Sequence, residues 1–286
     1  MEIKSYAKLN LFLDVGDKRS DGYHSVCFIN TQVSLHDVIR VKENEQGIII
    51  RSTHPDVPTG PSNLCYKVVH ELEQKYHINR GVDIWIEKSI PIAAGLGGGS
   101  SNAASVLMAL NELWKLSMTS EDMINFIRPI TTDGCYFITN GTCLIEGIGE
   151  RVIPLKSIPR LELVVICPDA VFNGHKTKSI YDQLDEYEQN HGLQHSSIDS
   201  ILGGIQSADR SQIIQGMNNI FLNITISQYQ PVYELIAKLK KENVEYVGLC
   251  GAGPSVFTVC ENLTVADEIA TRYSKQYVKT FAAHTL

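Results

Sequence analysis

The sequence predicts an α+β protein built from two domains. Strand-like and helix-like segments follow one another without the steady alternation of one strand and one helix that a doubly wound parallel sheet requires. The chain has 286 residues, 43% of them hydrophobic, which suffices for one large domain or two ordinary ones at roughly 100–200 residues per domain. Two prolines fall in the segment 154–160, so we place the boundary there and expect domains at 1–155 and 156–286.

The first half is expected to open with a strand at residues 4–15, where apolar and polar residues mostly alternate. Apolar positions at helical spacing predict a helix at 64–76, for which Ser62 is the candidate N-cap. A second helix at 100–114 follows a run of glycines. Further strands are expected at 26–33, 38–41, 48–50, 82–88, 136–138 and 142–145, and a short helix opened by Ser120 is expected at 120–129.

The second half is expected to begin with a strand at 161–167. The polar stretch 182–198 is rich in Gln, Glu, His and Ser and fits either a surface loop or an exposed helix. After it, helices are expected near 231–242 and 264–275, and strands at 244–249, 255–259 and 277–281.

The charge balance excludes two classes of partner. The chain carries 25 basic and 32 acidic residues, a net charge of −7, and no run of Lys or Arg exceeds two residues. Nucleic acids and polybasic attachment to membranes both depend on clustered positive charge. We therefore expect no nucleic-acid and no membrane partner, whereas an anionic small molecule could still bind a pocket lined by backbone N–H groups.

The cysteines and the N-terminus point to the cytoplasm. The seven cysteines are scattered and no two have C-x-x-C spacing, so a disulfide framework and a structural zinc site are poor interpretations. Thiols in a reducing compartment are the ordinary alternative. No cleavable signal pattern is visible, and no apolar segment approaches the length of about 18 residues that a membrane span requires.

The strongest chemical signal is PIAAGLGGGSSNAA at residues 91–104. Four of the five residues 95–99 are glycine, and they join a predicted strand to a predicted helix. Glycine lets a ligand approach the backbone closely, and a helix N-terminus offers unpaired N–H groups with a partial positive charge. We interpret the segment as a phosphate-binding loop. A glycine-rich turn without a ligand is the weaker alternative.

Two common nucleotide motifs do not match this loop. No Lys follows the glycines, so it is not a P-loop. The dinucleotide fingerprint G-x-G-x-x-G would need glycine at position 100, where the chain has Ser100, and the expected order of elements does not suit that fold. A nicotinamide-dependent oxidoreductase is therefore nearly excluded.

The segment 91–104 resembles the ATP-binding motif of the GHMP small-molecule kinases. Its GLGGGSSNAA form is most similar to the branch that phosphorylates 4-diphosphocytidyl-2-C-methyl-D-erythritol. Other segments match in the same order, and together they span nearly the whole chain. The resemblance implies the two-domain α+β GHMP kinase fold, with a ribosomal S5 domain 2-like N-terminal domain and a ferredoxin-like C-terminal domain. The matching segments are AKLNLFL at 7–13, DGYH at 21–24, EGIGE at 146–150 and GAGPSVF at 251–257.

The resemblance also implies a catalytic pair, Lys8 in AKLN and Asp133 in ITTDGCYFI. A carboxylate can accept the proton of an attacking hydroxyl, while a nearby ammonium keeps that carboxylate ionised and offsets charge on the transferring phosphoryl group. On composition alone Lys8 would be a surface lysine and Asp133 a turn aspartate. Their spacing to the flanking motifs favours the pair.

The chain departs from the family pattern around this aspartate. Thr131 and Thr132 stand in place of Gly and Ser or Ala, and Gly134 and Cys135 stand in place of Val or Ile and Pro. A misplaced carboxylate would leave a catalytically weak nucleotide-binding homologue, which is therefore an alternative from a different functional class. In the C-terminal motif, Cys250 and Ala252 replace serines.

The remaining site residues are also carried over by resemblance. Magnesium is expected to arrive with ATP, held mainly by phosphates and water, with Ser100 and Asp133 as the candidate protein ligands. Tyr23 and Tyr181 are expected to sandwich a cytosine whose edge bonds His24. The substrate pocket is completed by Asn10, Gly251 and Gly253, and the ATP pocket is formed by Pro91, Ala94, Gly95, Leu96, Gly97, Gly98, Gly99, Ser100 and Ser101 together with Asn63, Leu64 and Lys88.

These assignments predict an enzyme that uses ATP to phosphorylate the 2-hydroxyl of 4-diphosphocytidyl-2-C-methyl-D-erythritol in the non-mevalonate isoprenoid precursor pathway. Its expected partners are ATP and this cytidyl diphosphate sugar alcohol, and it is expected to act as a monomer or homodimer. A GHMP kinase for another small alcohol is the alternative within the same class. The DGYH segment and the form of the glycine loop argue against that alternative.

Overall fold

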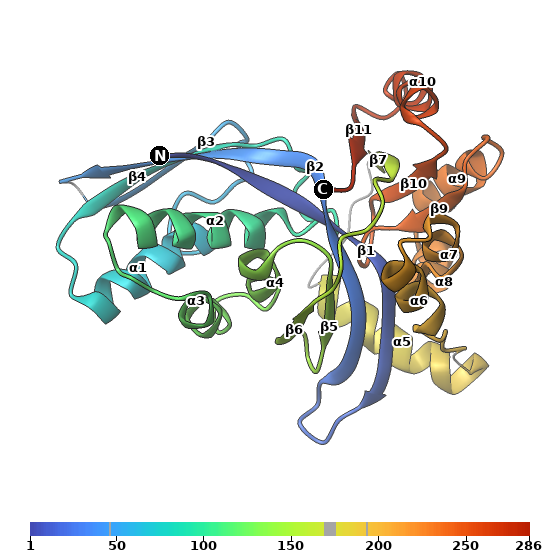
Figure 1. Ribbon diagram of the computed structural model, residues 1–286, viewed down its shortest axis with the longest axis horizontal. Helices are drawn as coiled ribbons and strands as arrows, with labels where there is room; N and C mark the ends of the chain where they lie inside the picture. The colour runs from blue at the N-terminus through green and yellow to red at the C-terminus, as the bar shows by residue number, and fades with distance from the viewer. Residues whose placement is uncertain (46, 169–175, 193) are drawn as a thin grey trace.

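The structure is a computed structural model that describes residues 1–45, 47–168, 176–192 and 194–286. Within these residues the strands form two sheets, one of seven strands and one of four. The larger sheet with its helices lies on one side of the molecule and the smaller sheet with its helices on the other (Figure 1). The long strands β1 (Glu2–Lys18) and β2 (His24–Asn44) pass between the two sides.

The larger sheet has the strand order β3-β4-β2-β1-β8, with β5 paired to β2 and β6 paired to β5. β1 and β2 form an antiparallel hairpin whose register shifts at Tyr6/Ala7, Asn10/Phe12 and Val15/Lys18. Such irregularities bend a strand pair and increase its twist, which lets one hairpin serve both sides of the molecule. The other strands are β3 (Ile48–Ser52), β4 (Gly81–Glu87), β5 (Cys143–Glu146), β6 (Arg151–Pro154) and β8 (Asn218–Asn219).

Helices cover one face of this sheet (Figure 1). Alternate residues of β4, Val82, Ile84 and Ile86, are buried in a cluster with the helices, as a strand of period two requires. Trp85 points to the opposite face and is 38% exposed. The helices are α1 (Leu64–Tyr76), α2 (Gly98–Leu113), α3 (Ser120–Ile127) and α4 (Asp133–Thr139).

The smaller sheet is antiparallel throughout, in the order β11-β7-β10-β9, and it is covered on both faces. In β7 (Glu162–Cys167), Leu163 and Val165 join a buried cluster with β1, β2, α6 and α7. Val164 and Ile166 join a second cluster with α9 and α10, which explains the unbroken apolar run of this strand. The remaining elements are α5 (Lys176–His191), α6 (Asp199–Ser207), α7 (Arg210–Gln215), α8 (Leu222–Gln228), α9 (Gln230–Leu239), β9 (Tyr246–Leu249), β10 (Val256–Cys260), α10 (Leu263–Tyr273) and β11 (Lys279–His284).

Most expected elements are found, but one strand was predicted wrongly. Residues 136–138 lie in helix α4, where the residues from Gly134 to Ile138 are all buried. A short apolar run fits a buried helix as well as a strand, and here the burial extends to every side of the helix. The N-cap of α1 is Asn63 rather than Ser62, because Asn63 Oδ1 accepts the backbone N–H of Cys65 at 2.8 Å.

The second half contains more helix than expected. The polar stretch 182–198 is helical up to His191, and α6, α7 and α8 were not anticipated. β8 is a two-residue strand from the second half that pairs with β1, so the larger sheet includes a contribution from beyond the proposed boundary. The boundary at residues 155 and 156 stays a prediction.

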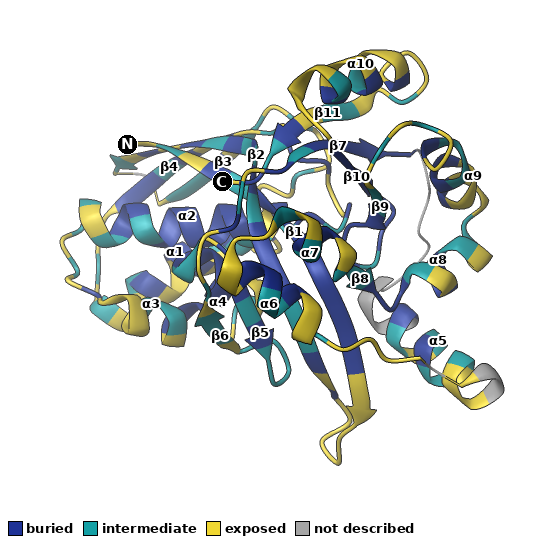
Figure 2. Ribbon diagram, turned by 45° about the vertical axis from the view of Figure 1, so that its right-hand side comes forward, coloured by how far each residue is buried: buried dark blue, intermediate teal, exposed yellow. Residues whose placement is uncertain are grey.

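The hairpin is buried where it passes between the two sides (Figure 2). The middle of β1 is buried, whereas the tip of the β1–β2 hairpin is exposed. All seven cysteines lie in the described ranges, and none of them is in a disulfide. Among the described residues, no helix combines the length and the apolar character needed to cross a membrane.

Candidate active site

The glycine-rich loop leads directly into α2. Gly95 and Gly97 have φ values of 82° and 70°, a left-handed conformation that glycine adopts without strain. Gly97 is the N-cap, so α2 begins at Gly98, two residues earlier than expected. Gly99 is exposed, and a Cβ atom placed on it would meet only Leu64 Cδ1, at 3.8 Å. The first turn of α2 therefore presents backbone N–H groups to open space, which suits an anion.

A second glycine turn holds this loop from the other side of the molecule. A Cβ atom on Gly95 would lie 1.8 Å from the carbonyl oxygen of Cys250, and one on Gly251 would lie 3.2 Å from the carbonyl oxygen of Gly95. Asn219 Nδ2 donates to the carbonyl oxygens of Leu249 at 3.0 Å and Gly251 at 2.8 Å. The two glycine motifs, far apart in sequence, are thus in direct backbone contact.

Behind the loop lies a buried carboxylate that sequence reasoning missed. Asp37 is 0% exposed. Its Oδ1 accepts the backbone N–H groups of Ser89 and Ile90, both at 2.8 Å. Its Oδ2 accepts Asn102 Nδ2 at 2.8 Å and is ion-paired with Lys88 Nζ. Asp37 therefore connects β2, the segment that enters the glycine loop, and α2.

This ion pair determines what Lys88 can do. The Lys88 side chain is 6% exposed, and a Cβ atom on Gly98 would lie 2.9 Å from Lys88 Nζ. The ammonium thus sits directly beside the first turn of α2, and the Asp37 carboxylate balances its charge. Lys88 supports the loop from behind. Its ammonium is paired with Asp37, whereas the sequence interpretation expected it to contact the nucleotide.

Lys8 is also buried, with 6% of its surface exposed. Its Nζ donates to Asn10 Oδ1 at 2.6 Å, and Asn10 Nδ2 donates to Asn30 Oδ1 at 2.6 Å. The backbone N–H of Lys8 donates to the carbonyl oxygen of Leu96 at 3.0 Å, which fixes it against the glycine loop. Burial lowers the pKa of Lys8, and the nearby charge of Asp133 opposes that shift.

Asp133 is the first residue of α4, not a residue of a loop, and it is exposed. Ser100 Oγ and Thr131 Oγ1 lie 2.7 Å apart, which joins the start of α2 to the segment before Asp133. A Cβ atom on Gly134 would lie 2.8 Å from Ile127 of α3. The unusual glycine therefore lets α4 pack closely on α3, and the aspartate stands at a well-supported helix start.

Tyr181 on α5 lies near the same carboxylate. Burial, reinforced by the charge of Asp133, raises the pKa of Tyr181 to about 12. Its ring centroid lies 5.4 Å from that of His24 and 5.2 Å from that of Phe221. Tyr23, by contrast, is 62% exposed at the hairpin tip. The structure thus brings Tyr181 and His24 together, and it leaves Tyr23 outside their ring contacts.

The buried His24 joins the hairpin to α5. Its Nδ1 lies 3.0 Å from the carbonyl oxygen of Gly16, and its Nε2 lies 3.0 Å from Asp185 Oδ1. Asp185 Oδ2 also accepts Lys18 Nζ at 2.7 Å. Asp185 and Lys18 were not among the predicted site residues, because nothing in the polar stretch 182–198 distinguishes one acidic residue from the others.

Several predicted ATP-binding residues have structural roles for their side chains. Ala94 and Leu96 are in the buried cluster that β1 and β2 share with the smaller sheet. Asn63 caps α1, and Ser101 Oγ donates to the carbonyl oxygen of Tyr6 at 2.7 Å. Only the backbone of these residues is available to a ligand. Pro91 is also buried.

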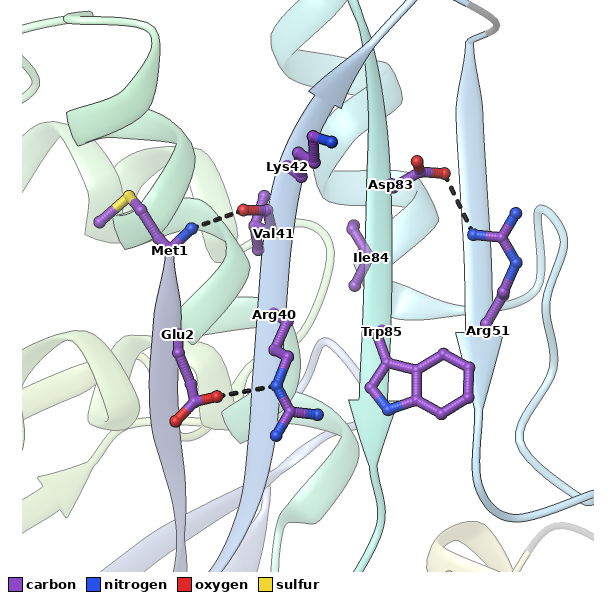
Figure 3. A pocket seen from close by; sticks show the side chains of 9 residues that line it. All are labelled: Met1, Glu2, Arg40, Val41, Lys42, Arg51, Asp83, Ile84 and Trp85. Carbon is purple, nitrogen blue, oxygen red and sulfur yellow. Dashed lines mark hydrogen bonds and ion pairs between the residues drawn. The ribbon is translucent and has the colours of Figure 1, made fainter.

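A separate hollow lies on the open face of the larger sheet, at the ends of β1 and β2 and beside β3 and β4 (Figure 3). It is lined by Trp85 and by ion-paired side chains such as Arg40 with Glu2 and Arg51 with Asp83. None of the predicted site residues lines it. Among the residues that the structure describes, no group of three His, Cys, Asp or Glu side chains could hold a metal ion.

Comparison with known proteins decides the family. The profile of the GHMP kinases N terminal domain matches residues 63–137, and that of the GHMP kinases C terminal domain matches residues 201–279. A 4-diphosphocytidyl-2-C-methyl-D-erythritol kinase of Clostridium acetobutylicum is 32% identical over 100% of both chains. The chain belongs to the GHMP kinase family. A second relative with the same name, from Clostridioides difficile, is 34% identical over 97% of this GHMP kinase and 94% of its own length.

Solved structures agree with this membership. The crystal structure of a 4-(cytidine 5'-diphospho)-2C-methyl-D-erythritol kinase superposes with a TM-score of 0.81 at 25% identity, over 100% of this GHMP kinase and 99% of that chain. Mevalonate kinase of L. major superposes with a TM-score of 0.75 at 15% identity, over 100% and 95% of the two chains. Because the identity to the mevalonate kinase is only 15%, that match supports the fold and not the function. The predicted α+β GHMP kinase fold is confirmed.

Proposed function

We propose that this GHMP kinase transfers the γ-phosphate of ATP to the 2-hydroxyl of 4-diphosphocytidyl-2-C-methyl-D-erythritol, a step of the non-mevalonate isoprenoid precursor pathway. The observation that carries the proposal is similarity along the entire chain. Relatives with this kinase's name are 32–34% identical over almost the full length of both proteins. Kinases of other small alcohols share the fold, but the mevalonate kinase of L. major and a homoserine kinase of Cytophaga hutchinsonii are only 15% and 17% identical to this chain.

The phosphates of ATP are proposed to bind at the first turn of α2. Gly99 leaves the backbone of this turn accessible, and the first N–H groups of the helix have no partner inside it. Partial positive charge at a helix N-terminus adds to the attraction. Because the charge of Lys88 is balanced by Asp37, we expect the loop backbone and Lys8 to supply most of the positive potential at the phosphates.

Lys8 and Asp133 are proposed to carry the chemistry. Asp133 would accept a hydrogen bond from the attacking hydroxyl and take its proton as the bond to phosphorus forms. Lys8 would offset the charge of the transferring group. Asn10 holds Lys8 Nζ through a 2.6 Å hydrogen bond, and Asn30 in turn orients the Asn10 amide. Because the Lys8 ammonium is already held in place, it would not have to move as negative charge develops on the transferring phosphoryl group.

Magnesium fits the available donors only as the partner of ATP. Hard oxygen ligands are what this ion prefers, and in phosphate sites it keeps several waters and takes one or two protein groups. Asp133 offers an exposed carboxylate, and the hydroxyl of Ser100 is held near it through Thr131. When bound, the ion neutralises charge on the β- and γ-phosphates.

The substrate's base is proposed to lie at the other end of the site, against Tyr181, Tyr23 and His24. Gly251 and Gly253 of the second glycine turn would line the path from there to the phosphates. We place the protein in the cytoplasm, in keeping with seven cysteines that form no disulfide. ATP and the sugar alcohol are its proposed small-molecule partners.

The proposal is tested by turnover. Purified protein, ATP and magnesium are mixed with the cytidyl substrate, mevalonate or homoserine in separate reactions, and ADP release is measured. We expect release with the cytidyl substrate alone. Release only with another alcohol would replace the proposed substrate. ATP binding without release from any alcohol would favour a nucleotide-binding homologue.

A further inference from the structure

Thr131 joins the first turn of α2 to the start of α4. Its Oγ1 lies 2.7 Å from Ser100 Oγ, a distance at which one hydroxyl donates a hydrogen bond to the other. Its backbone N–H donates at 2.9 Å to the carbonyl oxygen of Ile127, the last residue of α3. Its own carbonyl oxygen accepts the N–H of Gly134 at 3.1 Å, which closes a backbone turn that contains Asp133. One residue therefore connects the glycine loop, α3 and the carboxylate.

Packing holds the Thr131 side chain in one orientation. A Cβ atom on Gly134 would lie 3.0 Å from Thr131 Cγ2, so the missing side chain of Gly134 leaves room for the threonine methyl group. Branching at Cβ restricts rotation about χ1, and with the methyl group packed against Gly134 the hydroxyl faces Ser100. Thr131 and Gly134 are both departures from the family pattern. They fit together, because the methyl group of one occupies space that a side chain on the other would need.

The paired hydroxyls can present an oxygen to a cation in a fixed direction. Each hydroxyl has one hydrogen to donate and two lone pairs. If Ser100 Oγ turns a lone pair towards a cation, its hydrogen has to point away from that cation, and Thr131 Oγ1 is an acceptor at the required distance. Loss of an acceptor that orients a metal-binding group typically costs about 10- to 100-fold in metal affinity or activity.

We propose that Thr131 is a positioning residue whose hydroxyl fixes the Ser100 hydroxyl and the Asp133 carboxylate relative to each other. The inference rests on the proposed function, in which Ser100 and Asp133 are the two protein groups that meet the magnesium ion of ATP. Thr131 acts through these neighbours. Its loss should therefore reduce kcat and the benefit of magnesium, and it should leave KM for the alcohol substrate unchanged.

The test separates the hydroxyl of Thr131 from its methyl group. Thr131→Val keeps the shape and removes the hydroxyl, whereas Thr131→Ser keeps the hydroxyl and removes the methyl group. Thr132→Val is the matched control, because Thr132 is exposed and its side chain makes no capping hydrogen bond to α4. Ser100→Ala, alone and combined with Thr131→Val, completes a double-mutant cycle. We measure kcat and KM for each protein with magnesium in excess over ATP, and the melting temperature reports whether each variant is folded.

Thr131→Val is expected to reduce kcat about tenfold or more, and Thr131→Ser should retain most of the wild-type kcat. Thr132→Val should behave as the wild type does. In the Ser100→Ala background, Thr131→Val should have almost no further effect, because the partner of its hydroxyl is already gone. The proposal is overturned if Thr131→Val has the wild-type kcat, if Thr131→Ser loses as much as Thr131→Val, or if the effects of Ser100→Ala and Thr131→Val are additive.

Failure of the proposed function gives a different result. If the wild type phosphorylates none of the alcohols, calorimetric titration with a non-hydrolysable ATP analogue, with and without magnesium, still tests the inference. Magnesium should increase the affinity of the wild type for the analogue, and Thr131→Val should reduce that increase about tenfold, whereas Thr131→Ser should keep it. An equal magnesium effect in the wild type and in Thr131→Val, including no effect in both, contradicts the inference.

Discussion

The proposed phosphate end of this site is built from backbone, and the proposed base end is built from side chains. At the phosphate end, two glycine motifs touch through main-chain atoms, and the buried Asp37 and Lys88 support them from behind. At the base end, Tyr181 and Asp185 meet the hairpin residue His24 through ring and polar contacts. Phosphate is common to every reaction of the family, whereas the alcohol differs. A rigid backbone cradle suits the first requirement, and replaceable side chains suit the second.

The contrast extends to tolerance of mutation. A side chain on Gly95 collides with main chain that cannot move without separating the two halves of the site. Tyr23 is 62% exposed at a hairpin tip and can be removed without opening a cavity. Changes at the proposed phosphate end are therefore expected to affect folding or chemistry, and removal of the exposed Tyr23 is expected to affect substrate binding alone.

The largest effect is expected from Asp133→Asn. If this carboxylate takes the hydroxyl proton, kcat should fall by about 10²–10⁴-fold, with little change in affinity for ATP. Stability should change little because Asp133 is exposed at the first position of α4. Glu121→Gln is the matched control, since Glu121 occupies the first turn of the neighbouring helix α3. Steady-state kinetics of both variants decide the matter, and an active Asp133→Asn would assign the chemistry to another group.

Gly95→Ala should damage the fold itself. Its φ of 82° and the 1.8 Å approach to the Cys250 carbonyl oxygen combine left-handed strain of ~1–2 kcal/mol with overpacking of ~1–3 kcal/mol. A loss of melting temperature of about 5–15 °C follows. Gly22 has a similar φ of 84°, and a Cβ atom placed on it would have no neighbour within 4 Å. Gly22→Ala therefore measures the cost of the left-handed conformation without the collision. Equal melting temperatures for the two variants would mean that the collision is relieved.

Tyr23→Ala is expected to act on the substrate alone. Base–aromatic stacking is worth ~1–3 kcal/mol, so kcat/KM for the cytidyl substrate should fall by roughly ten- to a hundredfold. KM for ATP and the melting temperature should stay unchanged. Tyr233→Ala, another tyrosine with 50% exposure, serves as a control. Unchanged substrate kinetics in Tyr23→Ala would remove Tyr23 from the base site.

Gly99→Val should weaken ATP binding without unfolding the protein. Gly99 is in helical conformation with only Leu64 Cδ1 near its missing Cβ, so a side chain would project into the proposed phosphate site. Affinity for ATP should drop about tenfold, or ~1.4 kcal/mol, and Gly99→Ala should show a smaller drop. Calorimetric titration with a non-hydrolysable ATP analogue measures both, and unaltered affinity would place the phosphates elsewhere.

The smallest effect concerns pH. Burial lowers the pKa of Lys8 from the usual 10.5, so kcat should decline on the alkaline side below that pH. The arginine of Lys8→Arg keeps its charge to higher pH. The decline of kcat in this variant should therefore occur at a higher pH, whatever the absolute value of kcat. At pH values between the pKa of Lys8 in the folded chain and its higher pKa in the unfolded chain, Lys8 is protonated mainly in the unfolded chain. Its contribution to the free energy of unfolding therefore rises with pH in this range. A decline at the same pH in both proteins would exclude Lys8 as its origin.

Local patterns in the sequence predicted most of the fold. The alternating spacing of β4 and the helical spacing of α1 located these two elements, because each buries one consistent set of side chains. β7 was located by its unbroken apolar run, which is buried on both faces. The strand predicted at 136–138 was wrong because three consecutive apolar residues satisfy both periods, and only the packing of α4 on α3 decides between them.

Candidate site residues could be named where the sequence carries a contiguous motif. The glycine loop, Lys8 and Asp133 could be named because motifs and their order located them. Asp37 could not be named, since its partners Ser89, Ile90 and Asn102 are 52 to 65 residues away. Its one local signal was an aspartate on the face of β2 that also carries Leu35 and Ile39, both of which are buried.

The product of the reaction tests the account most directly. Phosphorus-31 NMR follows wild-type protein with ATP, magnesium and 4-diphosphocytidyl-2-C-methyl-D-erythritol, and Asp133→Asn is run in parallel. We predict one new phosphomonoester signal, formed in equal amount with ADP, assigned to the 2-hydroxyl and absent over the same time with Asp133→Asn. Inorganic phosphate as the only product, or a phosphomonoester on another hydroxyl, would contradict the account.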